Sequence, residues 1–237
     1  MRANPVFREG IQVYFLEGQG FIVYFYLLVI LAPIEFLTLF LPSLDPQVWM
    51  GPANLFKVAS IAALLLVVYF ALRIANQEFV PWRFVTLRRR IQQEGVGIGD
   101  VALAQLALLS LHALALIALA GPLVVWAGAI TRTPVPTILV VFLLIFFYAL
   151  SYGVWGLMAL AQWEHRLESR QVFVRGFLFS LILVSALVYL PLNPIAFLLS
   201  YLERRPTAAP AHLLFHLLLL GGGLCLYRWV LRKEAYH

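Results

Sequence analysis

Six long apolar runs, separated by short polar or turn-rich breaks, dominate the sequence. They cover about residues 21–41, 53–75, 101–130, 137–161, 174–192 and 211–231. A helix needs roughly 20 apolar residues to cross the hydrocarbon core of a bilayer. The pattern therefore predicts an all-α integral membrane protein, with six transmembrane helices in a single domain over residues 1–237. We expect Gly121-Pro122 to bend or interrupt the third helix.

Two short segments outside these runs also have helical patterns. Near the N-terminus, Asn4 and Pro5 form a typical cap and first-turn pair. Apolar residues recur after them at helical spacing, which predicts a helix lying in the membrane interface. Before the sixth run, Asn193-Pro194 precedes an apolar stretch that ends at residue 202 and is too short to cross. We expect this stretch to be a re-entrant helix.

Composition agrees with the membrane assignment. Of the 237 residues, 63% are hydrophobic and 12% are charged, and the mean hydropathy is +0.91, which excludes a water-soluble domain. The sequence contains neither a Gly-x-Ser-x-Gly elbow nor a His-Glu-x-x-His motif. We expect no enzyme activity from this chain alone. In a membrane protein, basic residues in the loops indicate which side of the membrane each loop occupies. We therefore attribute the net charge of +6 to orientation, and we expect no nucleic-acid partner.

The basic residues are distributed unequally between the two sides of the predicted bundle. If all six runs cross, thirteen lie on one side and three on the other, with Lys57 just inside the second run. The larger group is Arg2, Arg8, Arg73, Arg83, Arg88, Arg89, Arg90, Arg166, Arg170, Arg175, Arg228, Arg232 and Lys233, and the smaller is Arg132, Arg204 and Arg205. By the positive-inside rule, both termini should be cytoplasmic.

The longest cytoplasmic connection, about residues 75–100, combines an apolar stripe with positive charge. Phe79, Trp82 and Leu87 recur at helical spacing, and Arg83 and the run 88–90 supply the basic side. Such a helix would lie along the inner membrane surface. Anchoring to anionic lipid, at about 1 kcal/mol per basic residue, and docking of a cytoplasmic partner both explain the pattern.

Ionisable residues inside the spans are costly and are therefore candidates for function. Glu35 and Lys57 lie roughly 10 Å and roughly 6 Å below the outer face at about 1.5 Å per residue. We expect them to form an ion pair between the first two helices, with substrate contact as the alternative. His112, His212 and His216 could ligate haem or chlorophyll or hydrogen-bond to neighbouring helices.

The order and spacing of several short motifs resemble the membrane-spanning permease of type-2 ABC exporters. The matching segments are Asn4-Pro5-Val6-Phe7-Arg8-Glu9, Arg73-Ile74-Ala75-Asn76-Gln77-Glu78, Phe84-Val85-Thr86-Leu87, Gly99-Asp100, Gly121-Pro122 and Asn193-Pro194 followed by residues 195–202. The sequence departs from the family at Val80-Pro81-Trp82, which stands in place of a Gly-Thr pair, and at Asp100, where the family commonly has lysine.

The resemblance implies a permease subunit of an ATP-driven exporter. A second permease subunit, identical or related, a cytoplasmic ABC ATPase subunit and membrane lipid would be its partners. ATP and Mg would bind to the ATPase, and this chain would hold no cofactor. The protein would lie in a prokaryotic cytoplasmic membrane.

The resemblance also assigns roles to particular residues. It places a coupling helix over about residues 77–90 and the family's interfacial helix at the N-terminus. The implied ATPase-coupling residues are Glu78, Trp82, Arg83, Thr86, Arg88, Arg89 and Arg90, and those of the interfacial helix are Asn4, Pro5, Arg8 and Glu9.

Two other classes of protein remain open at this point. One is a structural or cofactor-holding membrane subunit of an electron-transfer or light-harvesting complex, motivated by His112, His216 and the many aromatic residues. The other is a membrane scaffold without transport activity.

Overall fold

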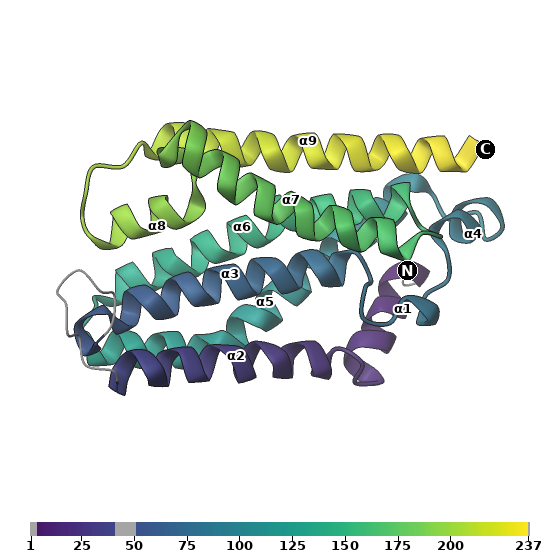
Figure 1. The fold of residues 1–237 in the computed structure, drawn as a ribbon. Helices are drawn as coiled ribbons and strands as arrows, with labels where there is room; N and C mark the ends of the chain where they lie inside the picture. The colour runs from purple at the N-terminus through teal and green to yellow at the C-terminus, as the bar shows by residue number, and fades with distance from the viewer. Residues whose placement is uncertain (1–3, 41–50, 237) are drawn as a thin grey trace.

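Helices make up most of the described chain. The computed structural model describes residues 4–40 and 51–236. Within this part, α1 and the end of α9 lie at one end of an elongated bundle (Figure 1), which we call the terminal end. The α-helices are α1 Pro5–Ile11, α2 Phe21–Phe40, α3 Leu55–Ala75, α4 Leu87–Gln92, α5 Ile98–Ile130, α6 Val135–Gln162, α7 Leu167–Val188, α8 Pro194–Leu202 and α9 Ala209–Tyr236; a π-helical turn covers Gln12–Leu16, and 3-10 turns cover Pro52–Asn54, Pro81–Arg83 and Leu190–Leu192.

Six of these helices, α2, α3, α5, α6, α7 and α9, are long and apolar enough to cross a membrane. The six predicted spans are confirmed to this extent. The fifth is displaced: α7 begins at Leu167 and ends at Val188. It ends early because Pro191, which has no amide hydrogen, follows in a 3-10 turn. Residue 41, the break at 42–50 and Arg2 lie outside the described residues.

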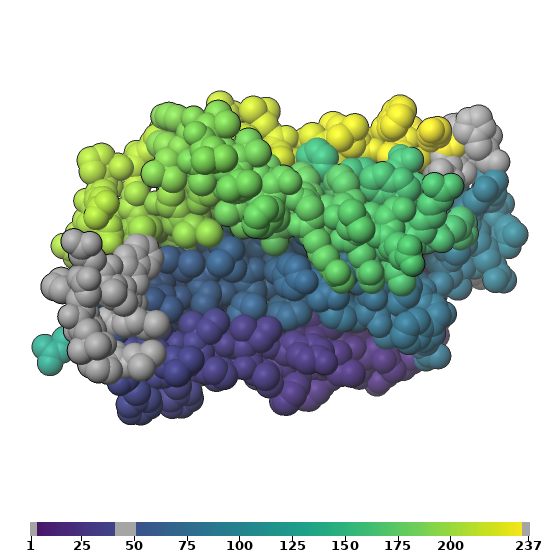
Figure 2. Space-filling model, viewed as in Figure 1, coloured from purple at the N-terminus to yellow at the C-terminus, as the bar shows by residue number. Residues whose placement is uncertain are grey.

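Helix α3 lies at the centre of the bundle. It packs against α2, α5 and α6, as Figure 1 shows. In an 18-residue apolar stretch of its span 61% of the residues are buried, compared with 11% and 17% in the corresponding stretches of α7 and α9. The two later helices are therefore peripheral, and Figure 2 shows α7, in green, covering part of the surface. Their outward apolar side chains suit contact with lipid tails or with another membrane subunit.

Small residues allow α3 and α6 to approach closely. A Cβ atom added to Gly156 of α6 would lie 2.4 Å from the carbonyl oxygen of Leu72 and 3.1 Å from Cβ of Ala75, both on α3. No side chain larger than hydrogen fits at this distance. Close backbone approach of this kind is a common way to hold helices together in a membrane.

Proline does not interrupt the third span. Pro122 lies inside α5, which continues as one helix to Ile130. Of the two effects expected at Gly121-Pro122, the interruption is absent, and the bend stays a prediction. Neighbouring helices of a membrane bundle commonly compensate for the hydrogen bond that an internal proline removes.

The segment after α7 forms the short helix that the Asn-Pro motif predicts. Asn193 caps α8, because its Oδ1 accepts hydrogen bonds from the amides of Ile195 and Ala196, each at 3.0 Å. Its Nδ2 donates to the carbonyl of Ile182 at 2.9 Å, which ties the cap to α7. Pro194 is the first helical residue. The position of α8 in a membrane stays a prediction.

Candidate functional site

The N-terminal helix is fixed to the start of α5. Asn4 caps α1 through hydrogen bonds from the amides of Val6 and Phe7 to its Oδ1, and Pro5 is the first helical residue. The predicted cap is therefore confirmed. Asn4 Nδ2 also donates to the carbonyl of Asp100 at 2.8 Å. Helix α1 thus begins at the point where α5 begins.

The connection between α3 and α5 does not form the single helix expected over about residues 77–90. It contains a 3-10 turn at Pro81–Arg83 and the separate helix α4 at Leu87–Gln92. Pro81 has no amide hydrogen, so it cannot continue a helix from the preceding residues. Thr86 then starts a new helix, since its hydroxyl accepts a hydrogen bond from the amide of Arg89.

Three carboxylates from other parts of the chain hold this connection, and we call them the carboxylate clasp: Glu9, Glu17 and Glu164. Glu17 pairs with Arg83. Glu9 Oε1 accepts a hydrogen bond from the amide of Val85 at 3.0 Å and lies 2.9 Å from Nη2 of Arg90. The clasp therefore joins α4 and the turn before it to the N-terminal segment.

The third member of the clasp comes from the connection between α6 and α7. Glu164 accepts hydrogen bonds from the amides of Leu87 and Arg88. These are the first two amides of α4, and a carboxylate at a helix N-terminus satisfies donors that have no partner within the helix. Leu87 itself is buried. Helix α4 is thus fixed by its first residues, while the side chains of Arg88 and Arg89 are exposed.

The environments of two clasp carboxyls differ. The hydrogen bond from Arg83, with a second from Gln12, holds the pKa of Glu17 below its ordinary value. Burial raises the pKa of Glu164, and the hydrogen bonds from Leu87 and Arg88 oppose that rise. The ionised form of Glu164 therefore depends on hydrogen-bond donors to offset its burial.

Replacement of Glu164 should loosen α4 locally. Glu164→Ala removes the acceptor of two helix-terminal amides, a loss of about 1–2 kcal/mol. We expect amide hydrogen exchange at Leu87 and Arg88 to accelerate about tenfold. Glu168→Ala removes an exposed carboxylate nearby and should leave both rates unchanged. Equal rates in the two variants would show that Glu164 does not hold α4.

Four side chains form the outward part of this region, which we call the cationic face: Trp82, Arg83, Arg88 and Arg89. Trp82 is 76% exposed, and the three arginines are exposed as well. Arg88 Nε also donates to Gln92 at 3.2 Å along α4. Trp and Arg are residue types that interfaces enrich, and this connection exposes one tryptophan ring and three guanidinium groups.

Glu78 and Arg90 do not belong to the cationic face. The Glu78 side chain is fully buried, and its Oε2 lies 2.8 Å from Nε of Arg73. Asn76 Nδ2 donates to its other oxygen at 3.1 Å. Arg90 is largely covered and is bound by Glu9 and Glu94. In this conformation internal partners engage both side chains, and their expected coupling roles stay predictions.

The predicted ion pair between Glu35 and Lys57 is wrong. Lys57 Nζ lies 3.1 Å from Oε1 of Glu203, just after α8. Glu35 faces the interior on the buried stripe of α2 that also contains Leu31 and Thr38. Both of its carboxyl oxygens are buried and have no hydrogen-bond partner among the described residues. Glu35 and Lys57 were expected to pair because they lie at similar depths in the predicted membrane. They do not, because Glu35 faces the interior of the bundle and Lys57 extends to Glu203 at the end of α8.

Two of the three intramembrane histidines, His212 and His216, lie together. His212 Nδ1 lies 2.8 Å from the carbonyl of Pro191, and its Nε2 bonds to the hydroxyl of Tyr148. Both nitrogens of His216 are also engaged, by the His212 carbonyl and by Tyr152. Ligation of a cofactor by either ring would break one of these hydrogen bonds.

The third histidine lies apart from the other two. His112 Nδ1 bonds to Tyr24 at 2.8 Å, whereas its Nε2 is buried and meets no hydrogen-bond partner in the described ranges 4–40 and 51–236. Its ring stacks on Phe15 and packs edge-on to Tyr14. No ring contact joins it to His216 within the described residues. The described side chains also include no group of three or more His, Cys, Asp or Glu that could hold a metal ion.

Sequence reasoning missed two members of the clasp, Glu17 and Glu164. Both lie in short polar segments next to apolar runs. Apart from this position, nothing in the neighbouring sequence indicates their role. Their role depends on contacts with residues 66 and 77 positions away, and no motif spacing reports such contacts. No family model matches the sequence, and the searches found no curated protein or solved structure that matches it.

Proposed function

We propose that this chain is the permease subunit of an ATP-driven ABC exporter. In this proposal a separate cytoplasmic ATPase subunit binds ATP and Mg, and it docks on the cationic face. A second permease subunit, identical or related, completes the translocation path. The chain itself contributes no catalytic group, and both termini face the cytoplasm of a prokaryotic cell.

The observation that supports this proposal most directly is the attachment of the cationic face to the rest of the molecule. The clasp connects residues 83–90 to α1 and to the connection between α6 and α7. A force applied at Trp82 and Arg88 would therefore act on several helices together. Two sites are coupled when both contact the same structural element and that element has more than one arrangement. Binding at the first site must favour one of these arrangements. The clasp supplies such an element.

The peripheral helices are compatible with a second subunit. The outward side chains of α7 and α9 are apolar over most of their length, for example Phe179, Leu183 and Leu218. Either lipid or a second permease subunit can cover them. Arg8 is exposed on α1, beside the clasp residue Glu9, so the interfacial helix adds positive charge close to the proposed docking region.

Capture of an ATPase from native membranes tests the proposal. The tagged full chain, solubilised in mild detergent, should recover a protein with a phosphate-binding Gly-x-x-x-x-Gly-Lys-Ser/Thr motif. Charge reversal at Arg88 and Arg89 should reduce this recovery at least fivefold, because both are exposed and lie outside the spans, where a charge change costs little to the fold.

The matched control reverses two exposed arginines away from the cationic face. Arg132→Glu and Arg204→Glu make the same change in net charge between other helices, and they should leave recovery of the ATPase unchanged. If no such ATPase is recovered with the wild-type chain, or if both double variants lose it equally, the proposed docking surface is wrong.

A further inference from the structure

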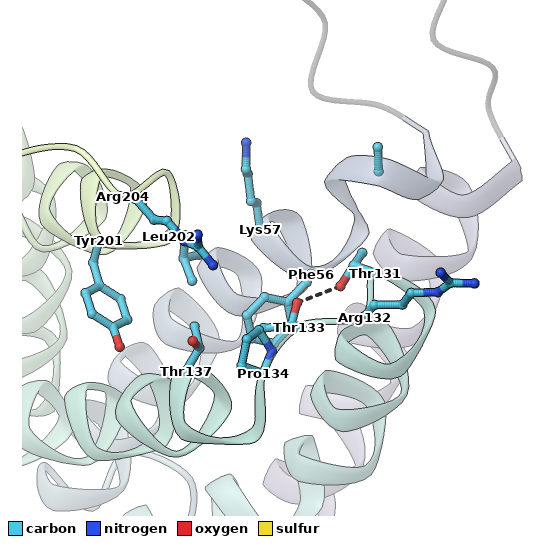
Figure 3. A pocket seen from close by; sticks show the side chains of 11 residues that line it. Phe56, Lys57, Thr131, Arg132, Thr133, Pro134, Thr137, Tyr201, Leu202 and Arg204 are labelled. Atoms are coloured by element: carbon cyan, nitrogen blue, oxygen red, sulfur yellow. Dashed lines mark hydrogen bonds between the residues drawn. The ribbon is translucent and has the colours of Figure 1, made fainter.

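A polar pocket of about 460 Å³ lies where the start of α3, the turn between α5 and α6, and the end of α8 meet. Figure 3 shows its lining from these three elements. The hydroxyl groups are those of Thr131, Thr133, Thr137 and Tyr201, and the first two are hydrogen-bonded to each other at 2.8 Å. The apolar part of the wall comes from Ala53, Phe56, Pro134 and Leu202.

The described residues around this pocket carry an excess of positive charge. Lys57, Arg132 and Arg204 line it, and its described lining contains no carboxylate. Glu203, next to the pocket, pairs with Lys57 at 3.1 Å and with Arg205 at 2.9 Å. Four cations and one carboxylate give a formal charge of +3. Neither Arg132 nor Arg204 forms an ion pair with a residue that the structure describes, so their charge is available to a ligand.

The backbone conformation of Arg132 and Arg204 also indicates a concentration of positive charge at this pocket. Arg132 and Arg204 each follow the end of a helix in the left-handed conformation, with φ of 53° and 54°. After both helices, the next amide bonds back to the carbonyl five residues earlier, at 2.8 Å and 2.9 Å. Glycine occupies this position most readily, because a side chain there is strained. The dipole of each helix favours a cation at its C-terminal end, which is where Arg132 and Arg204 lie. Arginine in place of glycine at two such ends that border one pocket also concentrates positive charge there.

Figure 3 shows how the cations are placed around the pocket. Lys57 extends from the first turn of α3, and the Arg204 side chain extends from the end of α8 toward it. The Arg132 side chain leaves the turn between α5 and α6 in the opposite direction, away from Lys57 and Arg204, so a phosphate held by both arginines would require a change in the Arg132 rotamer. The hydroxyl groups of Tyr201 and Thr137 lie below Lys57 and Arg204 in this view.

We propose that this pocket binds a phosphate group, either of a lipid head group or of a soluble phosphate ester. Guanidinium groups bind phosphate oxygens through paired hydrogen bonds, and hydroxyl groups can satisfy the remaining oxygens. The excess charge of +3 fits a group that carries one to two negative charges. The apolar wall leaves room for the carbon chain attached to the phosphate. Because the pocket lies at the ends of the predicted spans, lipid head groups are within reach.

Binding of short, water-soluble ligands to the purified full chain tests this site. The probes are dihexanoyl phosphatidylglycerol, dihexanoyl phosphatidylcholine, glycerol 3-phosphate and glycerol, each measured by titration calorimetry in the same detergent. We expect the anionic lipid to bind at least tenfold more tightly than the zwitterionic one, and glycerol not to bind. Binding of glycerol 3-phosphate would assign the site to soluble phosphate esters, and its absence beside binding of the anionic lipid would assign it to head groups.

Glycine substitution separates a binding role from a structural one. Arg204→Gly and Arg132→Gly together remove the two lining cations that have no ion pair among the described residues. They also relieve the left-handed backbone, so the midpoint of thermal unfolding should not fall. The affinity for the phosphate ligand should fall at least tenfold. Arg166→Gln with Arg232→Gln removes the same charge from two exposed arginines at the terminal end and should leave affinity unchanged.

Two results would overturn the proposal. The first is the absence of binding by every phosphate probe to the wild-type chain. The second is an equal loss of affinity in the glycine pair and in the glutamine pair, since this would mean that binding follows net charge and not the pocket. Neither result bears on the ATPase-docking proposal, because docking is attributed to Arg88 and Arg89 and not to the residues of this pocket.

Discussion

Gly156→Ala is expected to lower the free energy of unfolding by about 1–3 kcal/mol. The added methyl group would lie 2.4 Å from the carbonyl oxygen of Leu72, a backbone atom that cannot rotate away. Helices α3 and α6 would have to separate, and α3 is the most buried span of the bundle. Unfolding of the purified protein in a fixed detergent, followed by circular dichroism against temperature or added dodecyl sulfate, measures the change.

Gly176 provides the matched control for this substitution. It lies within α7, and a Cβ atom added there meets nothing within 4 Å. Gly176→Ala should therefore be neutral or stabilise the protein by about 0.5–1 kcal/mol, because alanine loses less conformational entropy in a helix than glycine does. If Gly156→Ala behaves like Gly176→Ala, the close approach of α3 and α6 does not exist.

Glu35→Met is expected to raise the free energy of unfolding by about 1–3 kcal/mol. The carboxyl of Glu35 is completely buried, and within the described part of the chain both its oxygens lack a partner. A buried polar group without hydrogen bonds costs about this much. Methionine has a similar length, no branch at Cβ and no polar group to satisfy, so it fits the same stripe of α2. The same unfolding measurement applies.

Two further variants check the cause of the Glu35 effect. Glu35→Gln keeps a polar group with no partner in the interior, so we expect much less stabilisation than with methionine. The effects of Glu35→Met and Lys57→Met should add, because Lys57 pairs with Glu203 and not with Glu35. Destabilisation by Glu35→Met would mean that the carboxyl makes a favourable contact other than those among the described residues.

The sequence by itself determined the class of the protein and most of its helices. Six apolar runs of sufficient length predict spans, because every backbone polar group inside a bilayer must be satisfied within a helix or a closed barrel. The caps at Asn4 and Asn193 were also predictable, since a cap depends on residues within one turn of each other. These features are local, and local chemistry decides them.

Only the tertiary structure decided which charged groups meet. Lys57 pairs with Glu203, 146 positions away, and Glu164 holds the first amides of α4 from a connection 77 positions away. Glu78 is directed inward by its contacts with Arg73 and Asn76. Which face of a helix meets which neighbour depends on how the whole bundle packs. Composition and spacing along the chain therefore predict that a helix exists, whereas its rotation and its neighbours decide what each ionisable side chain can bind.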